Sequence, residues 1–391
     1  MKPLEGVTIL DLSRVLACPF ASMILAELGA RVIKVERPGS GDETRTFEPQ
    51  LARDSAYYFA CNRSKESITV NLRSEDGRKL IRELAQKADV LVENFPVGTL
   101  ARHGLDFVSL CALNPRLIYV SCTGFGQTGP YKNKKGYDTV FQAMGGIMSL
   151  TGERGGAPVK PGLPVADLTS GLWVAIGILA ALAGREKTGK GCQVDFSMLD
   201  GQVSLLTLAA ARYFALGEVP PRLGTEHPGR VPSATFRCKD GKYAHITASD
   251  QHWAPLCKAL GIEQWGAAFP ENITRVERRD EVMRMLTEKI SALTRADLIA
   301  KLDELDVPVG PVNDVAEILG DPHVRARQLV GSFDYPDVGE FNALGIPYKF
   351  LGWDNPEIGA PPVLGEHTEA LLTELGYSRE RIAELKERRA I

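Results

Sequence analysis

Two features of this sequence have residue types and spacing suited to chemistry: a carboxylate at the start of a long apolar segment, and an arginine directly after a strand-like segment. Asp167 precedes residues 168–184, which carry no charge. A carboxylate can act as a covalent nucleophile, and the dipole of a helix favours an anion at its N-terminus. From the residues alone, the first interpretation of Asp167 is an N-cap, so a catalytic role needs a second line of support.

Arg37 follows Glu36 at the end of the second predicted strand. In dinucleotide folds an acid at this place binds ribose hydroxyls, whereas an arginine suits a phosphate carried on the ribose, because its fork pairs with two phosphate oxygens. An equal alternative is that Arg37 is simply a solvated residue at the end of the strand. Arg73 and Arg102 could supply the cations that a diphosphate requires.

The glycine motifs do not indicate NAD or ATP. Residues 124–129 match GxGxxG, but the basic segment 130–136 follows instead of a helix start, and the helix is what holds a pyrophosphate. The sequence contains no GxxxxGK[ST] and no GxSxG nucleophile motif.

The elements that must position these residues alternate between strand and helix. The predicted strands are residues 7–11, 31–35, 67–70, 89–92 and 117–120, and the predicted helices are residues 20–28 and 75–87. This alternation predicts βαβ units and a parallel sheet. Ligands of such sheets bind beyond the carboxyl ends of the strands.

The remainder of the chain predicts a second, smaller unit. Residues 138–216 look helical, with a break at 191–195, and residues 217–224 look like a linker. Residues 230–320 read as α+β, with a strand at 242–247 and one or two helices within 279–302, and a charged helix is expected at 378–389. Residues 168–184 are short for a membrane span, so we expect a buried core helix.

Composition restricts the possible functions. The 391 residues carry a net charge of −3, which argues against a nucleic-acid partner. The seven cysteines contain no CxxC pair, so neither a zinc site nor a disulfide framework is expected. We expect a soluble protein in a reducing compartment, the cytoplasm, with no membrane partner.

Five ordered motifs carry a family resemblance. They are residues 4–19, residues 28–42, Val92-Glu93-Asn94-Phe95 followed by Arg102, residues 123–130, and Asp167-Leu168-Thr169-Ser170-Gly171. In these motifs the chain resembles the class III CoA transferases (CaiB/BaiF, formyl-CoA transferase type), and the resemblance runs from end to end.

The resemblance implies a Rossmann-like large domain formed by residues 1–216 and 330–391, a small α+β domain at 217–329, and an interlocked homodimer. Coenzyme A and its thioesters would be substrates, with no separate cofactor and no metal. The positions that match the family's CoA contacts are Val15, Ala17, Arg37, Leu72, Arg73, Asn94, Phe95, Arg102, Lys135 and Tyr137.

The resemblance also makes Asp167 the expected nucleophile, which would pass CoA between two acids through an aspartyl-CoA thioester. Residues 224–232 would supply the closing loop. One rival is α-methylacyl-CoA racemase, which needs a second acid–base group where this chain has Tyr137, a poor base near neutrality. Another rival is a non-catalytic CoA-binding protein.

The acids remain open at this stage. Formyl-CoA transferases carry Gln where this chain has Leu16, and several segments resemble the branch that uses succinyl-CoA and a second dicarboxylate such as glutarate, 3-hydroxy-3-methylglutarate or itaconate. The far carboxylate of such an acid needs a cation or a hydrogen-bond donor. The candidates are Arg14, Arg45, His227 and Arg230, with Phe47 as an apolar wall.

Overall fold

The structure, a computed structural model, describes all residues 1–391. It divides into two compact units with separate cores. The first unit comprises Met1–Ile147, Pro161–Ala211 and His323–Ile391, and the second comprises Met148–Lys160 and Arg212–Pro322. The second unit thus includes Met148–Lys160, a segment that the sequence-based division places in the large domain.

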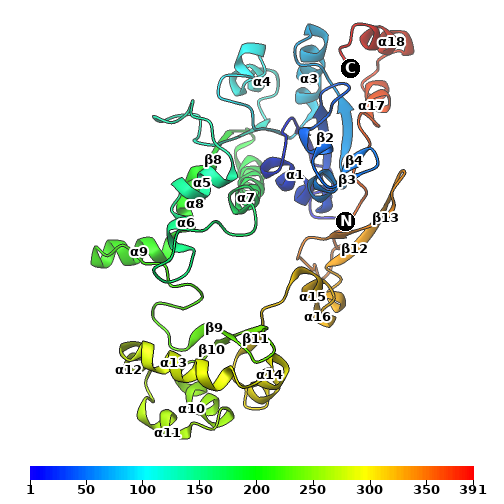
Figure 1. The fold of residues 1–391 in the computed structure, drawn as a ribbon. Helices are drawn as coiled ribbons and strands as arrows, with labels where there is room; N and C mark the ends of the chain where they lie inside the picture. The colour runs from blue at the N-terminus through cyan, green and yellow to red at the C-terminus, as the bar shows by residue number, and fades with distance from the viewer. The chain divides into compact units, whose positions relative to one another are not determined.

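A six-stranded parallel sheet forms the centre of the first unit (Figure 1). Its strands are β1 (Thr8–Asp11), β2 (Arg31–Glu36), β5 (Glu66–Thr69), β6 (Val90–Glu93), β7 (Ile118–Thr123) and β8 (Gln193–Ser197). Their order is β5-β2-β1-β6-β7-β8, and every neighbouring pair is parallel. The expected α/β class with a parallel sheet is confirmed, and the strand order is that of dinucleotide-binding folds, which reverses between β1 and β6.

Helices cover both faces of this sheet. Apart from three helices at its boundaries, the α-helices of the first unit are α1 (Ala17–Glu27), α2 (Ala56–Asn62), α3 (Glu75–Lys87), α4 (Phe107–Leu113), α5 (Asp138–Met144), α7 (Val165–Thr188), α8 (Met198–Ser204), α17 (Thr368–Glu374) and α18 (Arg379–Glu387). The buried residues of α1 and α7 share one core with one face of the sheet, and those of α3, α17 and α18 share a second core with the other face. The C-terminal helices α17 and α18 lie beside α3 (Figure 1), where Arg381 forms an ion pair with Asp76.

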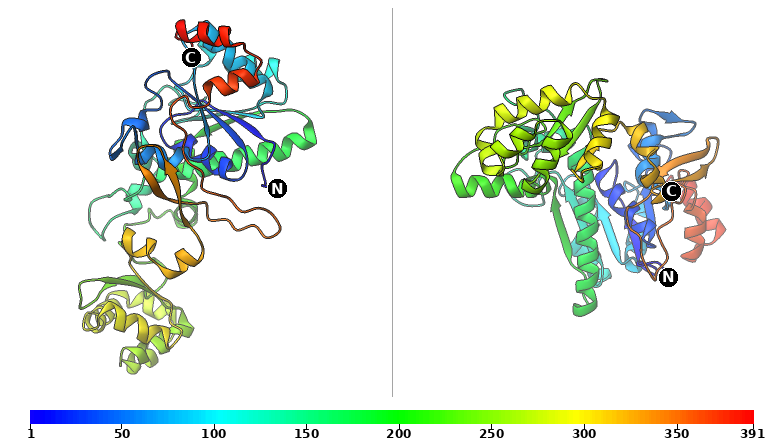
Figure 2. Two further views of the ribbon diagram at one scale, coloured as in Figure 1. Left: turned by 90° about the vertical axis from the view of Figure 1, so that its right-hand side faces the viewer. Right: turned by 90° about the horizontal axis from the view of Figure 1, so that it is seen from below.

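The long helix α7 lies along the sheet, as the two views of Figure 2 show in green. By length and composition its 24 residues could also cross a membrane. Val174 and Ile178 are nevertheless fully buried in the core shared with α1, which is the packing expected of a core helix. Gly171 permits close contact between the two helices, because a Cβ there would lie 2.7 Å from the carbonyl oxygen of Ala17.

A smaller set of elements packs beside the sheet. They are a 3₁₀ helix (Glu43–Thr46), the hairpin of β3 (Gln50–Leu51) and β4 (Asp54–Ser55), and the hairpin of β12 (Val330–Tyr335) and β13 (Gly339–Leu344). Phe59 of α2 packs against Phe333 and Phe341 of the second hairpin, so the C-terminal part of the chain is anchored to the N-terminal part.

The second unit is an α+β unit with a three-stranded antiparallel sheet in the order β11-β10-β9. Its elements are β9 (Ser233–Arg237), β10 (Tyr243–Thr247), β11 (Val309–Pro311), α10 (Asp250–Ala259), α11 (Glu263–Ala268), α12 (Asn272–Glu277), α13 (Arg279–Ile290), α14 (Arg295–Asp303) and α15 (Val315–Leu319). Three short helices lie where the chain passes between units, namely α6 (Ile147–Leu150), α9 (Thr207–Leu216) and α16 (Pro322–Ala326).

Candidate active site

A cavity of about 880 Å³ opens at the carboxyl ends of the strands. Arg14 comes from the loop after β1, Arg37 directly follows β2, Leu72 and Arg73 follow β5, and Phe95 follows β6. The cavity therefore lies where the strand order reverses, the position at which sheets of this topology bind ligands.

The rim of the cavity is basic. Arg37, Arg73 and Arg389 all line it with exposed side chains, and none of them forms an ion pair. Unpaired guanidinium groups around one cavity suit a ligand with several phosphates.

Arg389 is absent from the residues that the sequence predicts for this site. It follows α18, and the loop after β5 anchors it, because the backbone N–H of Asn71 donates to the Ala390 carbonyl at 2.8 Å and the Asn71 amide donates to the Arg389 carbonyl at 3.0 Å. Only the tertiary fold brings this C-terminal residue beside Arg73, so no local pattern could have revealed it.

The loop after β1 is joined to the end of β6. The side chain of Asn94 accepts from the N–H of Arg14 at 3.0 Å and donates to its carbonyl at 2.7 Å. The guanidinium of Arg14 lies 5.0 Å from the centre of the Phe95 ring and pairs with Glu43 at 2.9 Å. The structure thus brings Arg14 to Asn94 and Phe95, although Arg14 lies 80 positions before Asn94 in the sequence.

The prediction that Arg45 is a spare cation for the substrate acid is wrong. Its side chain is buried, with ion pairs of 2.7 Å to both Glu36 and Asp54. It also donates to the hydroxyl of Tyr58 at 2.5 Å. A guanidinium whose donors are already used inside the protein cannot bind a second carboxylate, so Arg45 is a structural residue.

The other predicted residues near the cavity occupy its edges. Phe47 lines the cavity and packs edge-on against Tyr57, with ring centres 5.8 Å apart. Arg102 is exposed and donates to the hydroxyl of Thr99, which also lines the cavity. Leu16 directly precedes α1 and Ala17 begins it, so both lie beside the loop that lines the cavity.

Asp167 occupies the third helical position of α7, and it does not cap the helix. The cap comes from Asp138, the first residue of α5, whose Oδ1 accepts from the N–H groups of Ala166 at 2.9 Å and of Asp167 at 3.1 Å. The carboxylate of Asp167 has no hydrogen-bond or ion-pair partner, so the N-cap interpretation of this residue is wrong.

The pKa of Asp167 is raised to about 7, first by burial and second by the negative charge of Asp138. Asp167 and Gly171 are four residues apart and share one face of α7, and Gly171 contacts the start of α1. A partly buried carboxylate without a partner is unfavourable for folding. Groups with strongly perturbed pKa values are concentrated at functional sites.

Lys135 and Tyr137 lie in the segment that leads into α5, and the side chain of Tyr137 is 83% exposed. His227 and Arg230 belong to the second unit. There His227 Nδ1 accepts from the Gly229 N–H at 3.1 Å, and Arg230 is exposed without a partner. The predicted roles of these four residues stay predictions.

Comparison with known proteins decides the family, because the model of CoA-transferase family III matches residues 4–368. The chain belongs to CoA-transferase family III. The predicted enzyme class, a CoA-transferase, is therefore confirmed.

Relatives of this CoA-transferase cover it almost completely. The human succinyl-CoA:glutarate CoA-transferase is 40% identical over 98% of this chain and 89% of its own. The acetyl-CoA:oxalate CoA-transferase of Acetobacter aceti is 39% identical over 95% of each chain. A CaiB/BaiF family protein from Brucella suis has a solved structure that is 41% identical, covers 96% of this chain and 99% of its own, and superposes with a TM-score of 0.87.

Proposed function

We propose that this CoA-transferase passes CoA from an acyl-CoA donor to a carboxylic acid through the carboxylate of Asp167. The observation that carries the proposal is the state of this side chain, which is partly buried, has no hydrogen-bond or ion-pair partner, and has a raised pKa. A carboxylate is a weak nucleophile in water, and removing its hydration shell makes it more reactive. Its pKa of about 7 keeps a large fraction ionised near neutrality.

The reaction proceeds as a series of acyl transfers. An Asp167 oxygen attacks the carbonyl carbon of the acyl-CoA, the C–S bond breaks, and an acyl–aspartyl anhydride and the CoA thiolate form. The thiolate attacks the aspartyl carbonyl carbon and releases the donor acid, which leaves an aspartyl-CoA thioester. The acceptor carboxylate then attacks the aspartyl carbonyl carbon and displaces the thiolate, which gives a second anhydride. The thiolate attacks the acceptor's acyl carbon in this anhydride, so the new acyl-CoA forms and the carboxylate of Asp167 is regenerated. The thioester energy is retained without ATP.

The basic cavity is the proposed site for the nucleotide part of CoA. Arg37, Arg73 and Arg389 supply unpaired guanidinium groups for its phosphates, and Leu72 and Phe95 supply apolar walls. Val15 and Ala17 connect this cavity to the face of α7 that bears Asp167, because the start of α1 contacts Gly171. No separate cofactor and no metal take part.

The proposed acids are succinyl-CoA as donor and a dicarboxylate as acceptor. The relative named for succinyl-CoA and glutarate supports this choice, whereas the relative named for acetyl-CoA and oxalate is almost equally similar, so identity alone does not decide it. Because Arg45 is excluded, Arg14 is the candidate cation of the first unit that remains for the far carboxylate of the acid, and it lies near Leu16 in the sequence.

Trapping at Asp167 tests the mechanism. Hydroxylamine added during turnover with succinyl-CoA should convert Asp167 into a hydroxamate, which peptide mass spectrometry detects. Asp167→Ala should lose at least about 10³-fold in kcat, the scale of removing a nucleophile. Asp200→Asn is a matched control, because Asp200 also lies in the first turn of a helix. A near wild-type rate for Asp167→Ala would exclude the mechanism.

Turnover in D₂O separates the racemase alternative, which no observation favours. A racemase exchanges the α-proton of a branched acyl-CoA with solvent, and this exchange requires a second acid–base group. The side chain at that position, Tyr137, is 83% exposed. Transfer of CoA without deuterium uptake from D₂O is expected, and a CoA-binding protein without catalysis would show neither activity.

A homodimer is proposed for the assembled enzyme. The outer face of α7 exposes Leu172, Trp173 and Ile176, which are 46%, 42% and 53% exposed. Apolar side chains gathered on one helix face indicate a partner surface, and a second copy would cover them. The interlocked arrangement of this dimer and its cytoplasmic location stay predictions.

A further inference from the structure

The backbone of the loop after β1 is hydrogen-bonded by side chains from other parts of the first unit. Lys34 Nζ, from β2, donates to the carbonyl of Ser13 at 3.1 Å. The Asn94 side chain bonds both polar groups of the Arg14 backbone. These contacts continue to Val15, the next residue.

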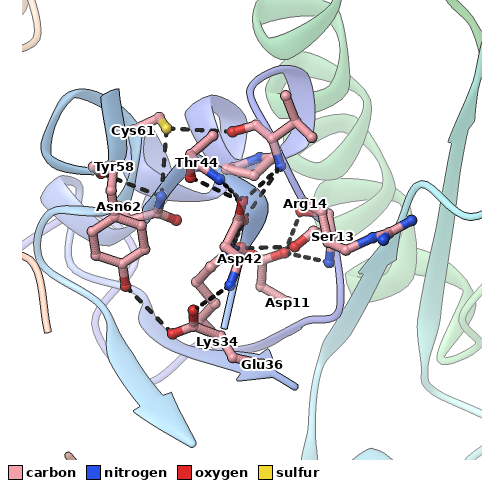
Figure 3. Close-up of polar contacts among 12 residues, drawn as sticks. Asp11, Ser13, Arg14, Lys34, Glu36, Asp42, Thr44, Tyr58, Cys61 and Asn62 are labelled. Atoms are coloured by element: carbon pink, nitrogen blue, oxygen red, sulfur yellow. Dashed lines mark hydrogen bonds and ion pairs between the residues drawn. The ribbon is translucent and has the colours of Figure 1, made fainter. Parts of the chain in front are cut away.

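Val15 has an unusual backbone conformation. Its φ is +70°, in the left-handed region, which a β-branched residue strongly disfavours. Its N–H donates to both carboxylate oxygens of Asp42 at 3.3 Å, and its carbonyl accepts from Cys61 Sγ at 3.5 Å (Figure 3). Such a conformation persists only where the surroundings impose it.

Asp42 is itself held firmly. Its side chain has no exposed surface, and its carboxylate accepts from Lys34 Nζ at 2.8 Å and from the N–H and hydroxyl of Thr44, each at 2.9 Å. Lys34 is also fully buried, so one buried pair bonds the loop at two places, Ser13 and Val15 (Figure 3).

We infer that the buried Lys34–Asp42 pair is a positioning device, which holds Val15 in the left-handed conformation and thereby fixes the direction of Arg14 and of the start of α1. Lys34 and Asp42 act through the backbone of the loop. The inference rests on the proposed function, because Arg14 and Leu16 on either side of Val15 are expected contacts of the acid, and Val15 and Ala17 are expected contacts of CoA.

Local sequence does not explain this conformation. Glycine would adopt it without strain, yet the chain has valine there. Without the pair, Val15 returns to a negative φ, and the peptide between residues 15 and 16 turns. The N–H groups at the start of α1, which begins with Leu16 as its N-cap and has no side-chain cap, then move away from the site.

A double-mutant cycle tests the inference. Asp42→Asn should speed amide hydrogen exchange in the peptide covering residues 13–17 and raise KM for succinyl-CoA, each roughly tenfold, with a smaller change in kcat. In a Val15→Gly background the left-handed conformation needs no support, so the same substitution should change KM by about twofold or less. Additive effects of the two substitutions would overturn the inference.

Glu27→Gln is the matched control. Glu27 forms another buried pair in the same unit, with Arg63 at 3.0 Å, and its side chain forms no hydrogen bond or ion pair with the loop after β1. This variant should lower Tm while leaving KM and the exchange of residues 13–17 unchanged. If Asp42→Asn gives only the same loss of Tm as Glu27→Gln, the pair is structural and the inference is wrong.

A second variant covers the case in which Asp42→Asn does not fold. Cys61→Ala removes the other bond to Val15 and leaves the Lys34–Asp42 pair intact, so exchange in the same peptide should stay within about twofold of the wild type. Roughly tenfold faster exchange with the pair intact would show that the pair does not hold Val15 and would overturn the inference. If exchange responds as expected in these variants while the wild-type protein transfers no CoA, the loop is positioned as inferred and it is the proposed function that fails.

Discussion

The carboxylate of Asp167 combines a structural cost with a proposed chemical role. It is partly buried, it has no partner, and the negative charge of Asp138 lies nearby. Burial and the like charge both favour the protonated form and raise its pKa. Asp11, in contrast, is fully buried, but Lys65, Lys34 and the hydroxyls of Ser13 and Ser22 outweigh the effect of burial and lower its pKa to about 2. The difference between the two residues is that Asp11 has cations and hydrogen-bond donors beside it.

Replacing Asp138 should change the pH dependence of the reaction. Asp138→Asn keeps an oxygen that can cap α7 but removes the like charge, so the pKa of Asp167 should fall while burial keeps it above 3.8. In the wild type, kcat/KM for the acyl-CoA should rise with pH through about 7, because the nucleophile must be ionised. The variant's rise should occur at lower pH, and an unchanged profile would mean that Asp138 does not influence Asp167.

The pKa of Asp167 also predicts a stability change with pH. Below pH 3.8 the group is protonated in the folded and unfolded states, and between about pH 4 and 7 it ionises first in the unfolded state. The contribution of protonated Asp167 to the free energy of unfolding is therefore lost as pH rises through 7. At about 1.4 kcal/mol per pKa unit, the free energy of unfolding of Asp167→Asn should rise by about 4 kcal/mol relative to that of the wild type between pH 4 and 8. Denaturant unfolding at a series of pH values measures this difference, and equal pH dependence in the variant and the wild type would contradict the raised pKa.

The basic rim predicts a preference for the 3′-phosphate of CoA. Arg37→Gln should weaken CoA about 10- to 150-fold, because it loses one charge-assisted contact, and should leave dephospho-CoA nearly unaffected. Arg389→Gln should also weaken the binding of CoA, since Arg389 lines the same cavity. Isothermal titration gives both affinities, and equal losses for the two ligands would assign Arg37 to another contact or to none.

At the scale of elements, the sequence predicts best where local signals agree. Helix α3 begins and ends where expected, because Ser74 caps it and its apolar residues follow the helical period. Helix α1 begins at Ala17, three residues before the predicted start, since Pro19 is tolerated in a first turn and does not mark a loop. The sequence predicts only a break between helices at β8, because an exposed edge strand has a weak apolar pattern.

The candidate site was predictable only in part, for a related reason. The sequence predicts Arg37 as a site residue because it follows a strand directly, which is a local signal. The sequence also predicts Arg45 as a spare cation, and only the fold shows Glu36 and Asp54 around it. Sequence alone likewise gave no role to Asp42, whose importance depends on its distance from Val15.

At the scale of the whole molecule, the exposed face of α7 is the feature that most requires a partner. This helix is apolar enough to suggest a membrane span, yet one of its faces is buried against α1 and the sheet. A membrane-spanning helix does not need to pack against a sheet in this way, whereas a helix at a dimer interface packs one face against its own chain and the other against the second copy. The apolar run at 168–184 is thus explained by packing within the chain on one side and by the proposed second copy on the other.

The proposed dimer can be tested on this face. Ile176→Lys places a charge where Ile176 is 53% exposed and Trp173 lies nearby in the sequence. Burying an unpaired charge is costly, so the dimer should dissociate at protein concentrations at least about tenfold higher than for the wild type. Thr188→Lys is the matched control, because it adds the same charge at the exposed end of α7 and should not alter the association. Sedimentation velocity over a concentration series measures both, and an Ile176→Lys protein that remains dimeric like the control would place the interface elsewhere.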